Sequence, residues 1–382
     1  MDNKKSSADI QYQNLLCRIF IENAKDEYKA IKQAFKNGKI TARLAYELIV
    51  GDKKLRTVLK EKTDERTGTG TYKTFGNTIR INLKEGFPLL TTKKTEYRSA
   101  LEELFWIISG DTNIKRLVDQ SVHNWDSDCY KAYLTKQHLI IPNQESPAWR
   151  IGKKEFIEKI KNKDRKDPFV IKYGDIGPAY GAQLRNYCGH DLFLNDINNK
   201  LKNAKFSEEF NKLVTEYNLP WKGDKGVDQL ADVIKTLKTN PNDRRMLAFM
   251  YNPKEKDQQV LPPCVIFYQF YVKDNELSVR GDIRSQDMFL GCPFDLISGA
   301  AFTHMIAQIT GYEVGEYIHN TGDTHVYDNH LEQAQEQLSR EPFEAPMIEL
   351  DPSITNIENF DSDNVKIKNY KYHDPIKAKI SV

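Results

Sequence analysis

The sequence predicts an α+β fold in which helices pack against a mainly antiparallel or mixed sheet. Residues 264–272 and 276–283 are rich in aromatic and β-branched side chains, and Lys273-Asp274-Asn275 between them is typical of a hairpin turn. An apolar segment from about residue 296 to 310 stops at Gly311, a common helix terminator. Two adjacent strands followed by a buried helix therefore form the predicted centre of the fold.

The helices and strands before this centre are predicted from the same kinds of sequence pattern. Residues 12–24 begin a helix, and residues 25–62 continue in a Lys-, Glu-, Ala- and Leu-rich helical pattern. The glycine-rich segment 66–71 interrupts the helix before a strand over 73–83. Residues 99–109 have the periodicity of an amphipathic helix.

The second half adds a helix over 227–237, which ends at Asn240-Pro241-Asn242-Asp243, and a strand through Met250. Residues 130–170 and 187–226 are rich in Lys, Asn and turn residues and are interpreted as insertions. The predicted organisation is a helical N-terminal segment with an insertion, 1–62, and a main domain, 63–382, that carries the two central insertions.

Composition indicates a water-soluble enzyme with a substantial core: 382 residues, 39% hydrophobic and 29% charged. A formal net charge of +2 gives no general reason to expect nucleic-acid or membrane binding. Apolar runs stay well short of the roughly 18 residues of a membrane span, and the N-terminus is polar. We expect a cytoplasmic location. Five scattered cysteines do not suggest a disulfide framework.

One stretch of the chain carries most of the chemistry. Cys264 follows two prolines at a strand start, Arg284-Ser285 comes twenty residues later with Asp287, and Asp295 follows soon after. A thiol can act as a nucleophile, an arginine beside a hydroxyl suits a phosphate, and carboxylates can hydrogen-bond a heterocycle. Although a lone cysteine is usually structural, these neighbours favour covalent chemistry on a nucleotide.

The order of motifs resembles the thymidylate synthase family. The matching blocks are Arg66-Thr-Gly-Thr-Gly-Thr71, Phe87-Pro-Leu-Leu-Thr-Thr-Lys93, Glu103-Leu-Phe-Trp106 with Gly110-Asp-Thr-Asn113, Gly177-Pro-Ala-Tyr180-Gly181, the Cys264 strand with Arg284-Ser-Gln-Asp287, and Gly322-Asp-Thr-His325-Val-Tyr327. The resemblance implies a thymidylate synthase-like fold, in which one face of the sheet forms the interface of a homodimer.

The same resemblance implies roles for individual residues. Cys264 would add to C6 of a pyrimidine nucleotide, and Glu103 would act as general acid and base through water. The remaining catalytic residues would be Tyr180, Asp287 and Arg284. The residues implied to bind the nucleotide are Arg66, Arg244, Arg245, Arg284, Ser285, Asp295, His325 and Tyr327, with Arg244 and Arg245 donated by the neighbouring subunit.

The cosubstrate implied by the resemblance is 5,10-methylenetetrahydrofolate. The positions that would contact it are Lys93, Trp125, Leu261, Asp287, Leu290, Gly291, Phe294 and Val382, the last through its carboxylate. We expect no metal, since His325 and His330 are five residues apart rather than the four of a helical metal pair. Binding of nucleic acid or membranes is not part of the expected activity.

Two departures from the family pattern lie around the 4-substituent of the base. Asp295 stands where the family usually has Asn, and Val265 stands where it usually has His. Asn offers an acceptor to uracil N3–H and a donor to O4, whereas an ionised Asp only accepts, which suits the amino group of cytosine. The departures resemble the deoxycytidylate hydroxymethylase branch, so the predicted product is 5-hydroxymethyl-dCMP.

Several alternatives remain open at this point. A protonated Asp295 could imitate Asn, which would favour a dUMP hydroxymethylase or a thymidylate synthase that makes dTMP. Capture of hydride rather than water would make the protein a dCMP C5-methyltransferase. A nucleotide- or RNA-binding regulator is the non-enzyme alternative. Hydroxymethylation would serve modified-base DNA synthesis in a bacteriophage, in which case the location is the host cytoplasm.

Overall fold

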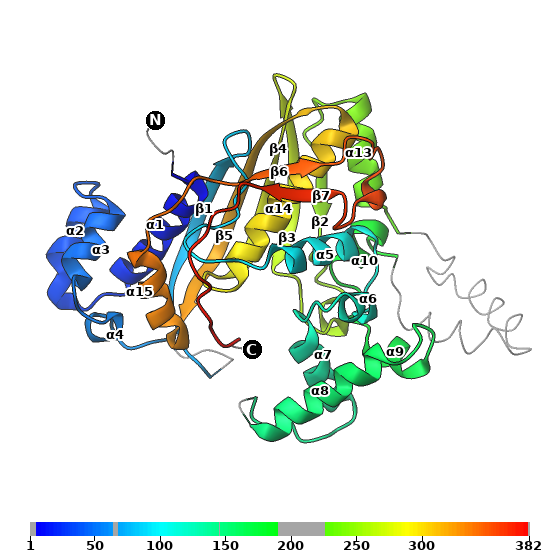
Figure 1. The fold of residues 1–382 in the computed structure, drawn as a ribbon, viewed down its shortest axis with the longest axis horizontal. Coiled ribbons are helices and arrows are strands. Elements are labelled where there is room, and N and C mark those ends of the chain that lie inside the picture. Colours follow the sequence, from blue (N-terminus) through cyan, green and yellow to red (C-terminus); the bar gives the residue numbers. More distant parts are fainter. Residues whose placement is uncertain (1–4, 64–67, 145, 190–225, 381–382) are drawn as a thin grey trace, which may run out of the picture. The chain divides into compact units, whose positions relative to one another are not determined.

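The computed structural model describes residues 5–63, 68–144, 146–189 and 226–380 (Figure 1). The chain divides into two compact units. The first comprises residues 1–105, 237–246 and 264–382, and the second comprises residues 106–236 and 247–263. Each unit is described by itself.

A mixed sheet forms the centre of the first unit. Its strands there are β1 (Thr71–Asn82), β5 (Glu313–Tyr327), β4 (Glu276–Asp287) and β3 (Val265–Lys273), in that spatial order. The β1–β5 and β3–β4 pairs are antiparallel, whereas the β4–β5 pair is parallel. The predicted α+β class with a mixed sheet is confirmed.

The hairpin between β3 and β4 has the expected two-residue turn. Asp274 and Asn275 have φ angles of 51° and 64°, and Lys273 pairs with Glu276. Positive φ at both central positions matches the right-handed twist of the flanking strands, and Asp and Asn tolerate it well. The sequence 273–275 is therefore sufficient to join the strand that follows Cys264 to the strand that carries Arg284.

Helix α14 (Gly291–Thr310) packs on β4 and β5 and supplies much of the core of this unit (Figure 1). Its buried residues include Leu296, Ile297, Phe302 and Met305, and it ends at Gly311 in the left-handed conformation. The helix was expected to begin near residue 296 but begins at Gly291. Pro293 lies in the first turn of this helix, where proline is well tolerated.

The first unit contains further helices around its sheet. Helix α1 (Ser7–Glu22) packs against β1, and the Ser6 side chain accepts the N–H of Asp9 as an N-cap. Residues 25–62 were expected to be broadly helical and form short separate helices. The other elements are η1 (Asp26–Tyr28), α2 (Lys29–Lys36), α3 (Ala42–Val50), α4 (Leu55–Val58), η3 (Asp328–His330), α15 (Leu331–Ser339), η4 (Ile357–Asn359), and the two-stranded sheet of β6 (Met347–Leu350) and β7 (Val365–Lys368).

The second unit is mainly helical. Its elements are α6 (Lys115–Asp119), α7 (Asp126–Lys136), α8 (Pro147–Lys161), α9 (Pro168–Tyr173), α10 (Gly181–Asn186), strand β2 (Leu247–Phe249) and η2 (Lys256–Gln258). Two helices belong partly to each unit, α5 (Tyr97–Ile108) and α13 (Gln229–Thr239). Residues 130–170, interpreted as an insertion, form helices with an aromatic core, and most of the second proposed insertion lies outside the described residues.

Among the described residues, no helix is both long enough and apolar enough to cross a membrane.

Candidate active site

Cys264 and Arg284 lie opposite each other on neighbouring strands of the first unit. The backbone N–H of Arg284 donates to the carbonyl of Cys264 at 2.8 Å, and the next pair in register is Val265 with Ile283. Cys264 is a free, partly buried thiol just before β3. The hairpin thus brings a thiol-bearing and a guanidinium-bearing residue together from positions twenty residues apart.

The parallel pairing of β4 with β5 adds a histidine to the same region. Asp287 pairs in register with His325, and Ser285 pairs with Asp323. His325 Nδ1 is hydrogen-bonded to Asp323 Oδ1 at 3.0 Å, and its ring contacts Tyr327 edge-on with centroids 5.1 Å apart. The hydrogen bond from His325 holds the pKa of Asp323 below its usual value. His325 and Tyr327 therefore form a fixed polar pair.

Asp287 organises the connection from β4 into α14. Its Oδ1 accepts the backbone N–H of Phe289 at 2.9 Å and that of Leu290 at 3.4 Å. This loop leads directly to Gly291 and Phe294 in the first turn of α14. The carboxylate of Asp287 thus holds in place the segment that the sequence associates with the cosubstrate.

Asp295 also lies in the first turns of α14 and is partly buried. Its Oδ2 accepts a hydrogen bond from Nε2 of Gln286 at 2.8 Å. Burial raises the pKa of Asp295 to about 7, the bond from Gln286 opposes that rise, and the negative charges of Glu103 and Asp287 add to it. Near neutral pH this carboxyl can be either an acceptor or a donor.

Helix α5 presents two consecutive carboxylates with different surroundings. Glu102 is buried, accepts a hydrogen bond from Ser362 and lies 3.8 Å from Arg98. Glu103 is half-buried. The negative charge of Glu103 raises the pKa of the Asp295 carboxyl group, so the two carboxyl groups interact electrostatically.

Lys93 is almost fully buried in the first unit. Its Nζ donates to the carbonyl of Phe289 and lies 3.5 Å from the centroid of the Phe289 ring. Burial lowers the pKa of Lys93 to about 7. The Lys93 side chain therefore stabilises the Asp287–Gly291 loop from its buried side.

The second unit holds three predicted site residues in one aromatic cluster. The Trp125 and Tyr180 rings meet edge-on with centroids 5.6 Å apart, Trp106 packs on Trp125, and Leu261 packs against the same cluster. Tyr180 has a φ of 45°, an unusual value for a bulky residue. Such strained residues concentrate at functional sites, and the flanking packing has to maintain them.

Two comparisons with known proteins agree with this arrangement. The family model described as thymidylate synthase matches residues 53–382. A thymidylate synthase of Mycoplasma mobile (strain ATCC 43663 / 163K / NCTC 11711) is 40% identical over 322 residues, which cover 84% of this chain and 95% of the relative.

The chain belongs to the thymidylate synthase family. It is therefore a one-carbon transferase, and the cosubstrate of the family is methylenetetrahydrofolate. Each unit, taken by itself, offers groups that suit this cosubstrate. In the first unit, the Asp287 carboxylate can accept from an N–H donor of a pterin. In the second unit, the Trp125 and Tyr180 rings can pack on an aromatic ring.

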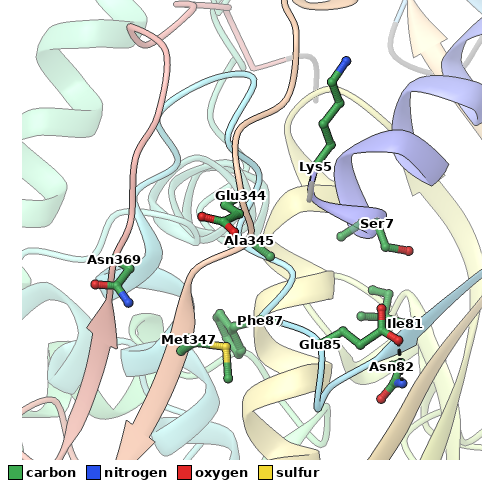
Figure 2. A pocket seen from close by; sticks show the side chains of 12 residues that line it. Lys5, Ser7, Ile81, Asn82, Glu85, Phe87, Glu344, Ala345, Met347 and Asn369 are labelled. Carbon is green, nitrogen blue, oxygen red and sulfur yellow. Dashed lines mark hydrogen bonds between the residues drawn. The ribbon is translucent and has the colours of Figure 1, made fainter. Parts of the chain in front are cut away.

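Two surface depressions in the first unit differ in whether predicted site residues line them. One, of about 1270 Å³, lies over β3 and β4 and is lined by Arg244, Tyr271, Arg280 and Ile318. The other, of about 310 Å³, contains Phe87 and Met347 beside hydrogen-bonded Asn82 and Glu85 (Figure 2). The lining of the second includes none of the predicted site residues.

Three predicted residues are less informative in the described structure. Arg66 and Val382 lie outside the described residues. Arg245 is exposed and is held by Asp243, with Nε at 2.9 Å from Oδ1, so its loop sits at the surface. Within the described residues there is no cluster of three or more His, Cys, Asp or Glu side chains suited to a metal.

Sequence reasoning missed the polar residues behind Asp295. Gln286 occupies the variable position of the Arg-Ser-x-Asp motif, and His319 and Tyr317 precede the Gly322–Tyr327 block. These side chains meet only because β4 and β5 pair in parallel, with Gly281 opposite His319. The one available signal was a polar side chain, Gln286, on a strand that also carries site residues.

Proposed function

We propose that this protein transfers a one-carbon unit to C5 of dCMP and yields 5-hydroxymethyl-dCMP. The observation that carries the proposal is the carboxyl group of Asp295, at the position where the family usually reads the base with Asn. Its Oδ2 accepts a hydrogen bond from Gln286, which favours the ionised form. An ionised carboxylate only accepts, which matches the amino group of cytosine and opposes O4 of uracil.

The neighbourhood of Cys264 supports the same choice. Val265 is buried and apolar at the position where the family usually has a polar histidine. A buried apolar side chain cannot hold water near a 4-oxo group by hydrogen bonding. A mismatched base would leave polar groups unpaired, at a cost of about 1–3 kcal/mol per group.

The chemistry of the chain follows from its residues. The Cys264 thiolate adds to C6 of the pyrimidine, which makes C5 nucleophilic. Methylenetetrahydrofolate supplies the one-carbon unit when bound. Glu103, half-buried on α5, moves protons through water at C5 and at the 4-position.

The rest of the nucleotide is bound by polar groups already described. Arg284 and Ser285, beside Cys264 in the hairpin, bind the phosphate together with Arg66. The fixed pair His325 and Tyr327 binds the 3′-hydroxyl of the sugar. A two-point contact of this kind favours a deoxyribonucleotide.

A homodimer completes the proposal. The depression over β3 and β4 exposes aromatic surface, since Tyr271 is 60% exposed, and Arg244 is one of the residues that line it. Exposed aromatic and arginine side chains are typical of protein interfaces. We assign this face to a second copy of the chain, whose Arg244 and Arg245 reach the phosphate of the first.

Synthesis of dTMP from dUMP is the second candidate. A pKa of about 7 lets a protonated Asp295 donate to O4 and accept from N3–H, as Asn does. The relative at 40% identity is a thymidylate synthase, which favours the same alternative. The two candidates differ in the ionisation state of Asp295, which decides the base, and in whether water or hydride completes the reaction.

Mass spectrometry of products tests the proposal directly. The protein is incubated with methylenetetrahydrofolate and equal concentrations of dCMP and dUMP, with Cys264→Ser as the inactive control. Hydroxymethyl-dCMP is the expected product. Exclusive formation of dTMP or hydroxymethyl-dUMP would overturn the choice of base, and methyl-dCMP would overturn the choice of water over hydride. Binding without any product or tritium release would favour a nucleotide-binding regulator.

A further inference from the structure

A series of three hydrogen bonds extends from the core of the first unit to Asp295. Tyr317 Oη lies 3.1 Å from His319 Nδ1, His319 Nε2 lies 2.8 Å from Gln286 Oε1, and Gln286 Nε2 lies 2.8 Å from Asp295 Oδ2. Tyr317, His319 and Gln286 are each at most 1% exposed, whereas Asp295 is only partly buried. The series therefore begins in the core and ends at an accessible carboxyl group.

The direction of these bonds follows from the chemistry of their ends. An ionised Asp295 can only accept, so the amide NH₂ of Gln286 faces it and the amide oxygen faces His319. His319 Nε2 must then carry the hydrogen. Burial lowers the pKa of His319 to about 3, so the ring is neutral and Nδ1 accepts from the Tyr317 hydroxyl.

The opposite direction leaves one donor without a partner. If a protonated Asp295 donated from Oδ2 to Gln286, the amide and the imidazole would both reverse, and His319 Nδ1–H would donate to the Tyr317 oxygen. The Tyr317 hydrogen would then need another acceptor, and within the described part of the chain the Tyr317 hydroxyl has one hydrogen-bond partner, His319. A buried unsatisfied donor is costly. Tyr317 thus selects the direction that keeps Oδ2 an acceptor.

Packing holds Tyr317 in this role. A Cβ on Gly299 of α14 would lie 2.1 Å from Cζ of the tyrosine, so only glycine leaves room for the ring. Gly281 on β4 also lies close to the tyrosine, since a Cβ there would be 2.9 Å from the Tyr317 hydroxyl oxygen. The hydroxyl is therefore fixed against His319 by close contacts from both a helix and a strand.

We propose that Gln286, oriented by His319 and Tyr317, is a positioning residue that sets the hydrogen-bond pattern of Asp295 by keeping Oδ2 committed as an acceptor. A proton taken up by Asp295 is then confined to Oδ1. The consequence for substrate choice, which rests on the proposed function, is a preference for a base that carries an amino group at its 4-position.

Other ionisable groups around Asp295 are unchanged by the proposed variants. Glu103 on α5 and Asp287 on β4 raise its pKa, and the Cys292 thiol on α14 and the Tyr268 hydroxyl on β3 also interact with it. Because all four remain in place, a shift in the titration of Asp295 reports on the hydrogen-bond series.

The test is a pH titration of Asp295 by ¹³C NMR of carboxyl-labelled aspartate, with the resonance assigned from Asp295→Asn. Gln286→Leu removes the donor, and Tyr317→Phe removes the group that selects the direction while keeping the ring. Each variant is expected to raise the pKa of Asp295, by about one unit in Gln286→Leu. The matched control is Thr303→Val, which loses a buried hydroxyl bonded to Gly299 on the same helix. A titration equal to that of the control in both variants overturns the proposal.

Nucleotide binding then separates this proposal from the proposed function. In the two variants at pH 7.5, binding of dUMP is expected to strengthen relative to binding of dCMP. For Gln286→Leu, the ratio of the two dissociation constants should change by about tenfold. If the unmodified protein uses dUMP alone, the choice of cytosine is wrong, and the carboxyl titration still decides the role of Gln286. If binding moves toward dUMP in Thr303→Val as well, the effect is one of general packing and the role of Gln286 in selection is overturned.

Discussion

The backbone N–H of Arg284 donates to the carbonyl of Cys264 at 2.8 Å, which joins the proposed nucleophile and the proposed phosphate-binding arginine across the β3–β4 hairpin. This pairing is set by the two-residue turn at Asp274-Asn275 together with a one-residue register shift between Val265 and Phe267. A one-residue slip would turn every side chain of a strand to the opposite face. The turn and the register shift together place Arg284 opposite Cys264.

Cys264→Ser should abolish turnover. A serine hydroxyl is a far weaker nucleophile than a thiolate at neutral pH, so release of tritium from 5-tritiated nucleotide should fall by more than about 1000-fold. Cys188→Ser is the matched control, because Cys188 is an exposed free thiol of the second unit. Tritium release by Cys264→Ser at a tenth of the original rate would contradict covalent catalysis by this residue.

Substrate choice should depend on pH around 7. Because the pKa of Asp295 is raised to about 7, the acceptor-only carboxylate forms as the pH rises through that value. The ratio of kcat/KM for dCMP to that for dUMP should increase by up to about tenfold per pH unit across this range, because the ratio of ionised to protonated Asp295 rises tenfold per unit. Steady-state kinetics at pH 6 to 8.5 measure this ratio. Asp295→Asn should favour dUMP at every pH, and a pH-independent ratio in the unmodified protein would contradict the model of base reading.

The same carboxyl group should destabilise the fold at high pH. Its pKa is raised from 3.8 to about 7, so its contribution to stability is fully present below pH 3.8 and is lost as the pH rises through 7. Replacement by Asn keeps an acceptor for Gln286 and removes the charge. Asp295→Asn should therefore be more stable at pH 8.5, by up to about 4 kcal/mol and less to the extent that the side chain is exposed.

Urea unfolding at pH 5 and pH 8.5 measures this difference. The gain from Asp295→Asn should shrink toward pH 5, and an exposed aspartate, Asp363, changed to Asn provides the control with no such trend. A destabilised Asp295→Asn at pH 8.5 with an unchanged fold would mean that the carboxylate is compensated by a partner in the native state.

Local signals explain which parts of this structure were predictable. The hairpin turn, the strand after Cys264 and the helix end at Gly311 each depend on residues close together in the chain. Strand β5 was not predicted as a strand, because its polar run of His, Asn, Thr and Asp is unlike the usual strand composition. Its parallel pairing with β4 is a non-local contact, and no sequence pattern close to β5 predicts it.

The series of hydrogen bonds that ends at Asp295 was not predictable for the same reason. Gln286 and His319 are 33 residues apart and meet through the β4–β5 pairing. The sequence predicts that Asp295 decides the base, since the chemistry of Asp differs from that of Asn. It could not show what bonds to its second oxygen, because that depends on tertiary packing around Tyr317 and Gly299.

Mixing two inactive variants should restore activity if the phosphate arginines come from a second copy of the chain. One variant is Cys264→Ser, and the other carries Arg244→Ala and Arg245→Ala. A hybrid dimer then contains one site that has an intact thiol from one chain and intact arginines from its partner. With random exchange, half of the dimers are hybrids and each has one working site, so about 25% of the original activity should return.

The control uses an arginine that is fixed beside the thiol of its own chain. Arg284 is bonded to Cys264 through the backbone, so a hybrid of Cys264→Ser with Arg284→Ala has no intact site and should stay inactive. Subunit exchange is verified by native mass spectrometry before turnover is measured. Hybrids of the first pair that form but show no activity would place Arg244 and Arg245 outside the partner's site, and the depression over β3 and β4 would then need another explanation.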